Sequence, residues 1–212
     1  GDAGIDAGGL QLNTAFGRSW RLQAGAWYQT GHDRDGLTLD AYMTTLALTY
    51  QPHLVGATIG WDYLSGNNAF STSATNHRFD PLYGTPHKFW GYMDYFYAGT
   101  GSATGGLNNP FLKGKYASRN SRLSVELCYH YFGLAANQKD TKGQAVTKRL
   151  GSEVDAIVNY GLNKVTTLEL GACALYGTHS MEYAKGITPN TARLNASWVY
   201  LQLNIRPDFL QK

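Results

Sequence analysis

The chain has 212 residues, and only 16% of them are charged, which is well below the ~25% of ordinary soluble domains. The formal net charge of +3, without any Lys/Arg-rich run, argues against a nucleic-acid partner. No apolar run approaches the ~18 residues of a membrane helix. Abundant Gly, Tyr and Trp with few charges therefore predict an all-β fold, an antiparallel transmembrane β-barrel. A soluble Tyr-rich β-sandwich or lectin-like domain is the alternative.

Period-2 alternation predicts the first strands at 9–17 and 19–30, and a regular one at 54–65 with Val55 and Ile59 outward. The strand expected at 37–50 changes phase near Thr44 and Thr45, because its apolar residues switch parity there. One extra residue reverses every later side chain, so we expect a β-bulge at this point.

The segment 82–99 is the most aromatic part of the chain. Aromatic rings lie on both parities, and Tyr and Trp are most stable at membrane interfaces, so we expect a strand over 87–98. A helix is the alternative, although Gly91 would weaken it. The preceding segment 66–87 must cross the membrane, contain a further strand or lie on an unusual side.

Five further strands are expected, at 107–117, 122–134, 150–160, 165–176 and 192–206. Val125, Leu127 and Leu150 are expected on the outward faces of their strands. The total is about ten strands with lengths near the ~9–11 residues that cross a tilted bilayer. Short turns alternate with long loops, as in outer-membrane barrels.

Polar side chains of the opposite parity are expected to line an aqueous lumen, because Arg or Lys facing lipid costs about 2–4 kcal/mol. The solute path predicted in this way comprises Arg21, Gln23, Asp62, Lys113, Lys115, Arg122, Glu126, His130, Glu153, Asp155, Glu169 and Arg206. These residues either select solutes by charge or only form salt bridges that stabilise the wall.

A set of residues within 82–99 resembles the signature of alginate-export-type outer-membrane porins of Bacteroidetes-like bacteria. The residues that carry this resemblance are Tyr83, Gly84, His87, Lys88, Phe89, Gly91, Tyr92, Met93, Asp94, Tyr95 and Phe96. The resemblance implies a bacterial outer-membrane protein with a barrel of roughly eighteen strands, of which residues 1–212 are one C-terminal segment. Because acids and bases are interleaved here, a polar solute or oligosaccharide is expected rather than alginate.

No CxxC, HExxH, calcium-loop or P-loop spacing is present, so the sequence predicts no cofactor and no metal. Cys128 and Cys173 fall on non-neighbouring strands, too far apart for a disulfide. Asp94 and His87 lack an accompanying nucleophile, so an enzyme is not expected. A channel is favoured, with outer-membrane lipid and a polar solute as partners. A structural or partner-binding barrel, as a subunit of an envelope complex, and an outer-membrane enzyme are the alternatives.

Overall fold

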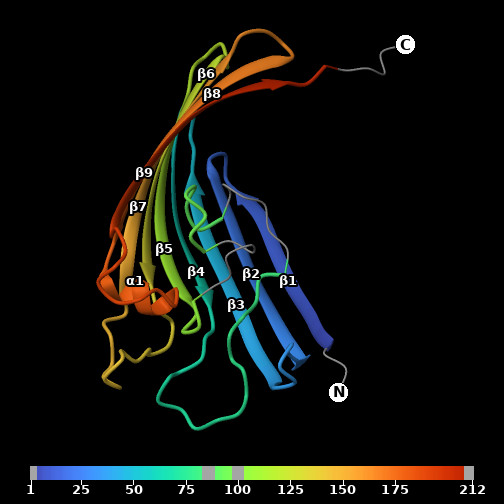
Figure 1. The fold of residues 1–212 in the computed structure, drawn as a ribbon. Helices are drawn as coiled ribbons and strands as arrows, with labels where there is room; N and C mark the ends of the chain where they lie inside the picture. Colours follow the sequence, from blue (N-terminus) through green and yellow to red (C-terminus); the bar gives the residue numbers. More distant parts are fainter. Residues whose placement is uncertain (1–3, 83–88, 97–102, 208–212) are drawn as a thin grey trace.

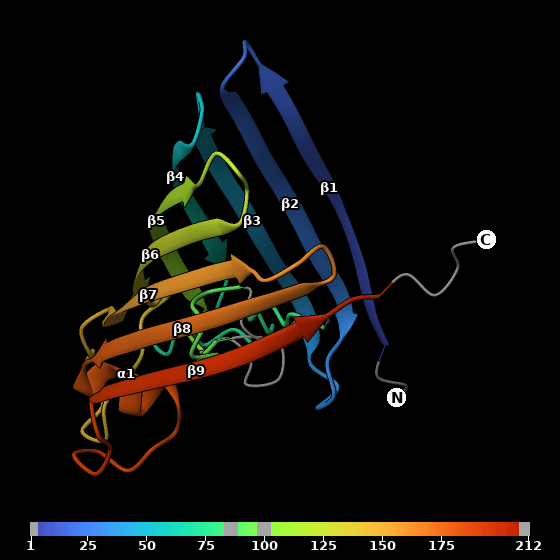
Figure 2. The same cartoon turned by 90° about the horizontal axis from the view of Figure 1, so that it is seen from above.

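The computed structural model describes residues 4–82, 89–96 and 103–207, and it confirms an all-β protein (Figure 1). One sheet contains nine antiparallel strands, each paired with its neighbours in sequence. The strands are β1 (Gly4–Phe16), β2 (Trp20–His32), β3 (Thr38–Tyr50), β4 (Val55–Leu64), β5 (Leu107–Ala117), β6 (Leu123–Gly133), β7 (Arg149–Gly161), β8 (Thr166–Gly177) and β9 (Asn195–Ile205). The sheet is curved, but β1 and β9 do not pair, so it does not close into a barrel in this chain (Figure 2).

The two ends of the sheet differ in the length of their connections. One end, the turn end, carries the short connections 17–19, 51–54, 118–122 and 162–165. The other end, the loop end, carries the short connection 33–37 and the long connections 65–106, 134–148 and 178–194. The last of these contains α1 (His179–Ala184). In the described part of the chain, no helix has the length and hydropathy needed to cross a membrane.

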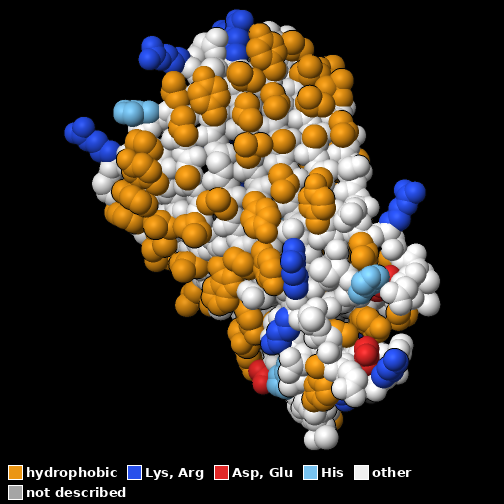
Figure 3. All heavy atoms as spheres, turned by 90° about the vertical axis from the view of Figure 1, so that its left-hand side faces the viewer, with side chains coloured by type: hydrophobic (Ala, Val, Ile, Leu, Met, Phe, Trp, Pro, Cys, Tyr) orange, Lys and Arg blue, Asp and Glu red, His pale blue; other side chains and the backbone are white. Residues whose placement is uncertain are grey.

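The convex face of the sheet is apolar and exposed. Register partners share a face, and one row across β4 to β9 consists of Val55, Tyr116, Val125, Val158, Leu170 and Leu201. Val55, Ile59 and Leu127 are 62%, 65% and 55% exposed, so they do not pack into a central core. Away from the strand ends, the outward positions of β4 to β9 carry no Asp, Glu, Lys or Arg. Hydrophobic side chains accordingly dominate the part of this face that lies over the strands (Figure 3).

The strand predicted over 87–98 is wrong, because the described residues 89–96 are irregular. Trp90, Gly91 and Asp94 have φ values of 57°, 90° and 58°, which a β-strand does not accommodate. Leu64 and Leu107 are register partners, so the chain between them leaves and returns at the loop end. In its described part, the segment 66–87 adds no strand to the sheet.

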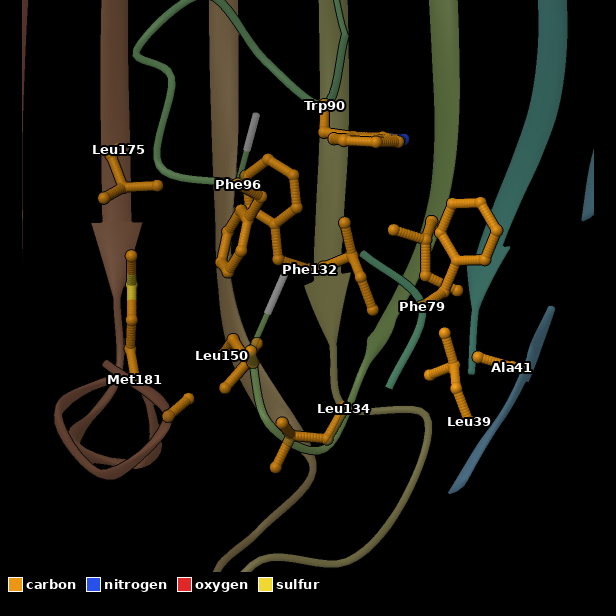
Figure 4. Close-up of a cluster of buried hydrophobic side chains, with 14 residues drawn as sticks. Leu39, Ala41, Phe79, Trp90, Phe96, Phe132, Leu134, Leu150, Leu175 and Met181 are labelled. Carbon is orange, nitrogen blue, oxygen red and sulfur yellow. The ribbon is translucent and has the colours of Figure 1, made fainter. Parts of the chain in front are cut away.

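The described parts of 65–106 pack onto the concave face near the loop end, where they complete a hydrophobic cluster (Figure 4). Phe96 is fully buried, and its ring centroid lies 4.8 Å from that of Phe132 on β6. The cluster also contains Leu39, Ala41, Phe79, Trp90, Leu134, Leu150, Leu175 and Met181. Phe79, Trp90 and Phe96 of this segment therefore pack against other residues of the protein.

Two further predictions are corrected by this cluster. β3 pairs with β2 in unbroken register, so the β-bulge expected at Thr44 and Thr45 is absent. The apolar parity changes because Leu39 and Ala41 face the inner cluster, whereas the later apolar residues of β3 face outward. The irregularity occurs instead where β6 meets β7, beside Gly133, and it turns Leu150 into the cluster and not outward as expected.

Glu182 fixes the loop between α1 and β9. Its side chain is 1% exposed, and its two oxygens accept the backbone N–H groups of Asn190, Thr191 and Ala192, each at 3.0 Å. His179 Nδ1 lies 2.9 Å from Oε2. The backbone donors and His179 together lower the pKa of Glu182 to about 2.

This arrangement predicts that acid weakens the protection of the loop's backbone amides against hydrogen exchange. Because the folded pKa of Glu182 is depressed, its contribution is complete above the unfolded value of about 4.3 and is lost as the pH falls toward 2. Hydrogen-exchange protection factors for Asn190 to Ala192 should fall over this range. Glu182→Gln should lower them already at pH 7 and remove the acid dependence. Asp35→Asn, an exposed acid on another loop, is the control and should leave both unchanged.

Candidate functional site: the concave face of the sheet

The predicted lumen residues lie on strand positions whose parity is opposite to that of the exposed apolar face. The exceptions are Arg122 and Arg206, which lie just before β6 and just after β9 at the turn end. Arg21, Gln23 and Lys115 are exposed, whereas His130, Glu153 and Asp155 are 4%, 0% and 0% exposed. The concave face therefore has an open part and a covered part.

The strand register determines which of these side chains become neighbours. Lys113, Cys128, Asp155 and Cys173 form one row across β5 to β8. In a neighbouring row His130 faces Glu153, and Lys115 faces Glu126 in another. Among the described residues, no ion pair joins any two of the predicted lumen residues. Arg21 on β2, Asp62 on β4 and Glu169 on β8 are not register partners of any other predicted lumen residue.

Residues 89–96 cover part of this face. The Met93 backbone N–H donates to Glu153 Oε1 at 2.9 Å. Lys185, beyond α1, donates to the Tyr95 carbonyl oxygen, and its Nζ lies 4.5 Å from the centroid of the Phe96 ring. The signature residues that the structure describes thus attach this segment to the wall. Tyr83, Gly84, His87 and Lys88 lie outside the described residues.

A cavity of about 460 Å³ lies beside β9, and of its lining residues the sequence singled out Glu169 as a lumen residue and Tyr92 as a signature residue. Its walls are Tyr92, Glu169, Trp198, Tyr200, Leu201 and Gln202. The rings of Trp198 and Tyr200 are stacked at 4.5 Å, and the Tyr200 hydroxyl donates to Glu169 Oε1 at 2.8 Å. Aromatic faces beside hydrogen-bonding groups suit a ligand that is part apolar and part polar. The alternation Trp198-x-Tyr200 on one strand was the available signal.

A second group that sequence reasoning missed lies in the covered part of this face. Cys128, His130 and Asp155 are buried, and one ligand atom from each lies within 4.8 Å of the others. Cys128 and Cys173 are both free thiols, separated by β7, as expected from the sequence. Cys128-x-His130 is not a familiar metal-binding spacing, and Asp155 is distant in sequence, so only the register reveals the group.

The fold and this face together define a curved antiparallel meander with an apolar convex side and a polar concave side. Comparison with known protein families and with curated proteins finds no match for this chain. The contrast between the apolar convex face and the polar concave face is therefore the main indication of function.

Proposed function

We propose that this chain forms wall strands of a transmembrane β-barrel in a bacterial outer membrane, and that its concave face lines a passage for polar solutes such as oligosaccharides. The observation that carries the proposal is the contrast between the faces. Rows of Val, Leu, Ile and Tyr lie exposed on the convex side, while the charged residues of β4 to β9, away from the strand ends, point to the other side. In water the exposed rows would be a large unfavourable patch, whereas in lipid they are the favourable arrangement.

The two free edges of the sheet, β1 and β9, must be paired if the strands are to lie in a membrane. Unpaired backbone groups of β1 and β9 in hydrocarbon would each cost several kcal/mol, so lipid-inserted strands require a closed barrel. Additional strands supply that closure in our proposal. The resemblance to alginate-export-type porins, with barrels of roughly eighteen strands, is in keeping with such a larger barrel.

The second candidate function is a structural or partner-binding barrel of an envelope complex with little conductance. One observation favours it: residues 89–96 are packed against the concave face through Phe96, Met93 and Tyr95. A segment held in this way occupies part of the space through which a solute would pass.

Conductance in planar lipid bilayers, measured on the closed barrel that contains the additional strands, distinguishes the two functions. We expect discrete current steps, because the concave face presents charged groups to water. Replacing Lys113 and Lys115 together by Glu should shift the reversal potential toward cation selectivity, since the local field changes sign. Lys164→Glu, in a turn outside the strands, is the matched control and should have little effect. Absence of current steps from correctly folded protein would favour the second function.

A further inference from the structure

The buried part of the concave face contains two acidic side chains, Glu153 and Asp155. Glu153 and Asp155 are both 0% exposed, and among the described residues neither forms an ion pair with Lys or Arg. Neither oxygen of Asp155 accepts a hydrogen bond of normal geometry, although the Glu153 carboxyl, the Cys173 thiol and the Tyr92 backbone N–H lie close to it. Burying negative charge in this way is unfavourable unless a counter-charge is present.

His130 presents a defined nitrogen to the same space. Asn109 Nδ2 donates to the Tyr131 carbonyl oxygen at 2.9 Å, so the amide oxygen of Asn109 must face His130. His130 Nδ1 lies 3.1 Å from that oxygen and therefore carries the proton. Nε2 is left with its lone pair and lies 3.0 Å from Cys128 Sγ. A ligating histidine is commonly oriented by such a hydrogen bond from its other nitrogen.

We propose that Cys128 Sγ, His130 Nε2 and an Asp155 carboxylate oxygen bind a divalent metal ion of the zinc class. All three residues are buried, and their ligand atoms lie within 4.8 Å of one another. A thiolate, an imidazole and a carboxylate are the donors that zinc uses, and three protein ligands leave a fourth position for water. Asp155 is fully buried and neither of its oxygens accepts a hydrogen bond of normal geometry, and this is the independent sign that the cluster lacks a cation.

The charge balance and the distance between the sulfur and nitrogen ligands are compatible with this assignment. Binding converts the Cys128 thiol to a thiolate and releases one proton to solvent, so the site of Zn²⁺, thiolate, carboxylate and neutral imidazole is uncharged overall. In a tetrahedral zinc site the sulfur and nitrogen ligands are roughly 3.5 Å apart. The present 3.0 Å between Cys128 Sγ and His130 Nε2 requires an opening of about 0.5 Å, within the range of a small side-chain rotation.

Lys113 opposes the metal. It is the register partner of Cys128, and its Nζ lies 5.3 Å from the centroid of the Phe111 ring, without an ion-pair partner among the described residues. A positive charge on the same row of the sheet repels a cation at the site. Metal affinity should therefore increase severalfold in Lys113→Met. If the cluster only packs the wall, Lys113→Met should leave metal binding unchanged.

Cobalt titration tests the proposal with the full chain, refolded in detergent and stripped with a chelator. We expect near-ultraviolet absorption from thiolate-to-cobalt charge transfer, saturating at one Co²⁺ per chain and displaced by Zn²⁺. Cys128→Ser should abolish this band, and Asn109→Ala should weaken binding roughly 10–100-fold. Cys173→Ser is the matched control and should retain the band.

Folding of each variant is checked by circular dichroism and by its gel mobility before and after heating. His130→Gln retains the thiol, so it carries the test if Cys128→Ser does not fold, and it should lower affinity strongly. Two results would overturn the proposal. One is the absence of a charge-transfer band from the wild-type protein at millimolar Co²⁺. The other is a band that persists in the folded Cys128→Ser or His130→Gln variant with unchanged affinity.

Discussion

Replacing Leu127 with arginine is expected to destabilise the protein in lipid by about 2–4 kcal/mol. Leu127 lies near the middle of β6, and its side chain is 55% exposed on the convex face. Its register partners are Gly114 and Ala156, which offer no acceptor for a guanidinium. If hydrocarbon surrounds this face, the new charge has neither water nor a counter-ion. Denaturant titration of protein folded into phospholipid vesicles measures the change in the free energy of unfolding.

Leu162→Arg provides the matched control. Leu162 is 49% exposed, similar to Leu127, but it lies in the 162–165 turn and outside the strands. Solvent-exposed substitutions of this kind usually change stability by less than about 0.5 kcal/mol. Equal small effects at the two positions would mean that water covers the convex face, and the membrane proposal would then be abandoned.

The strands were predictable because alternation is a local property. β5 has the predicted bounds of 107–117, and the other observed strands mostly end within a few residues of the predicted positions. The exposure of Val55, Ile59 and Leu127 likewise agrees with the outward parity assigned from the sequence. Each of these features depends only on which residues alternate along a single stretch of chain.

The failures occurred where a distant segment determines the environment. Alternation cannot distinguish an apolar residue that faces outward from one that faces a packed insertion. It therefore predicts Leu150 on the outward face, and a β-bulge near Thr44 where Leu39 instead faces the cluster. The same ambiguity produced a false strand around Phe96, whose partner Phe132 lies far along the chain. The residues of the concave face could be assigned by parity, but the proximity of Cys128, His130 and Asp155 depends on the register between strands. A sequence does not specify that register directly.

Gly91 should be the most sensitive position of the segment that covers the concave face. Its φ of +90° is a conformation that residues with a side chain rarely adopt. A Cβ atom built at this position would lie 2.5 Å from Glu153 Oε1. Glu153 is fully buried, and the same oxygen accepts the Met93 N–H, so the carboxylate has little freedom to move away. Backbone strain and overpacking together give an expected cost of roughly 2–4 kcal/mol for Gly91→Ala.

Two glycine controls separate these contributions. Gly143 also has a positive φ, of 77°, but nothing lies within 4 Å of a Cβ built there, so Gly143→Ala reports backbone strain alone. Gly114 on β5 has neither constraint, and Gly114→Ala should be tolerated. Limited proteolysis within 65–106 is the direct measurement, because Gly91→Ala should release this segment from the wall while the sheet remains folded. If Gly91→Ala is no more sensitive to protease than Gly143→Ala, the segment does not pack against Glu153. If it is released, the bilayer conductance of the variant should rise, because the freed segment no longer narrows the passage.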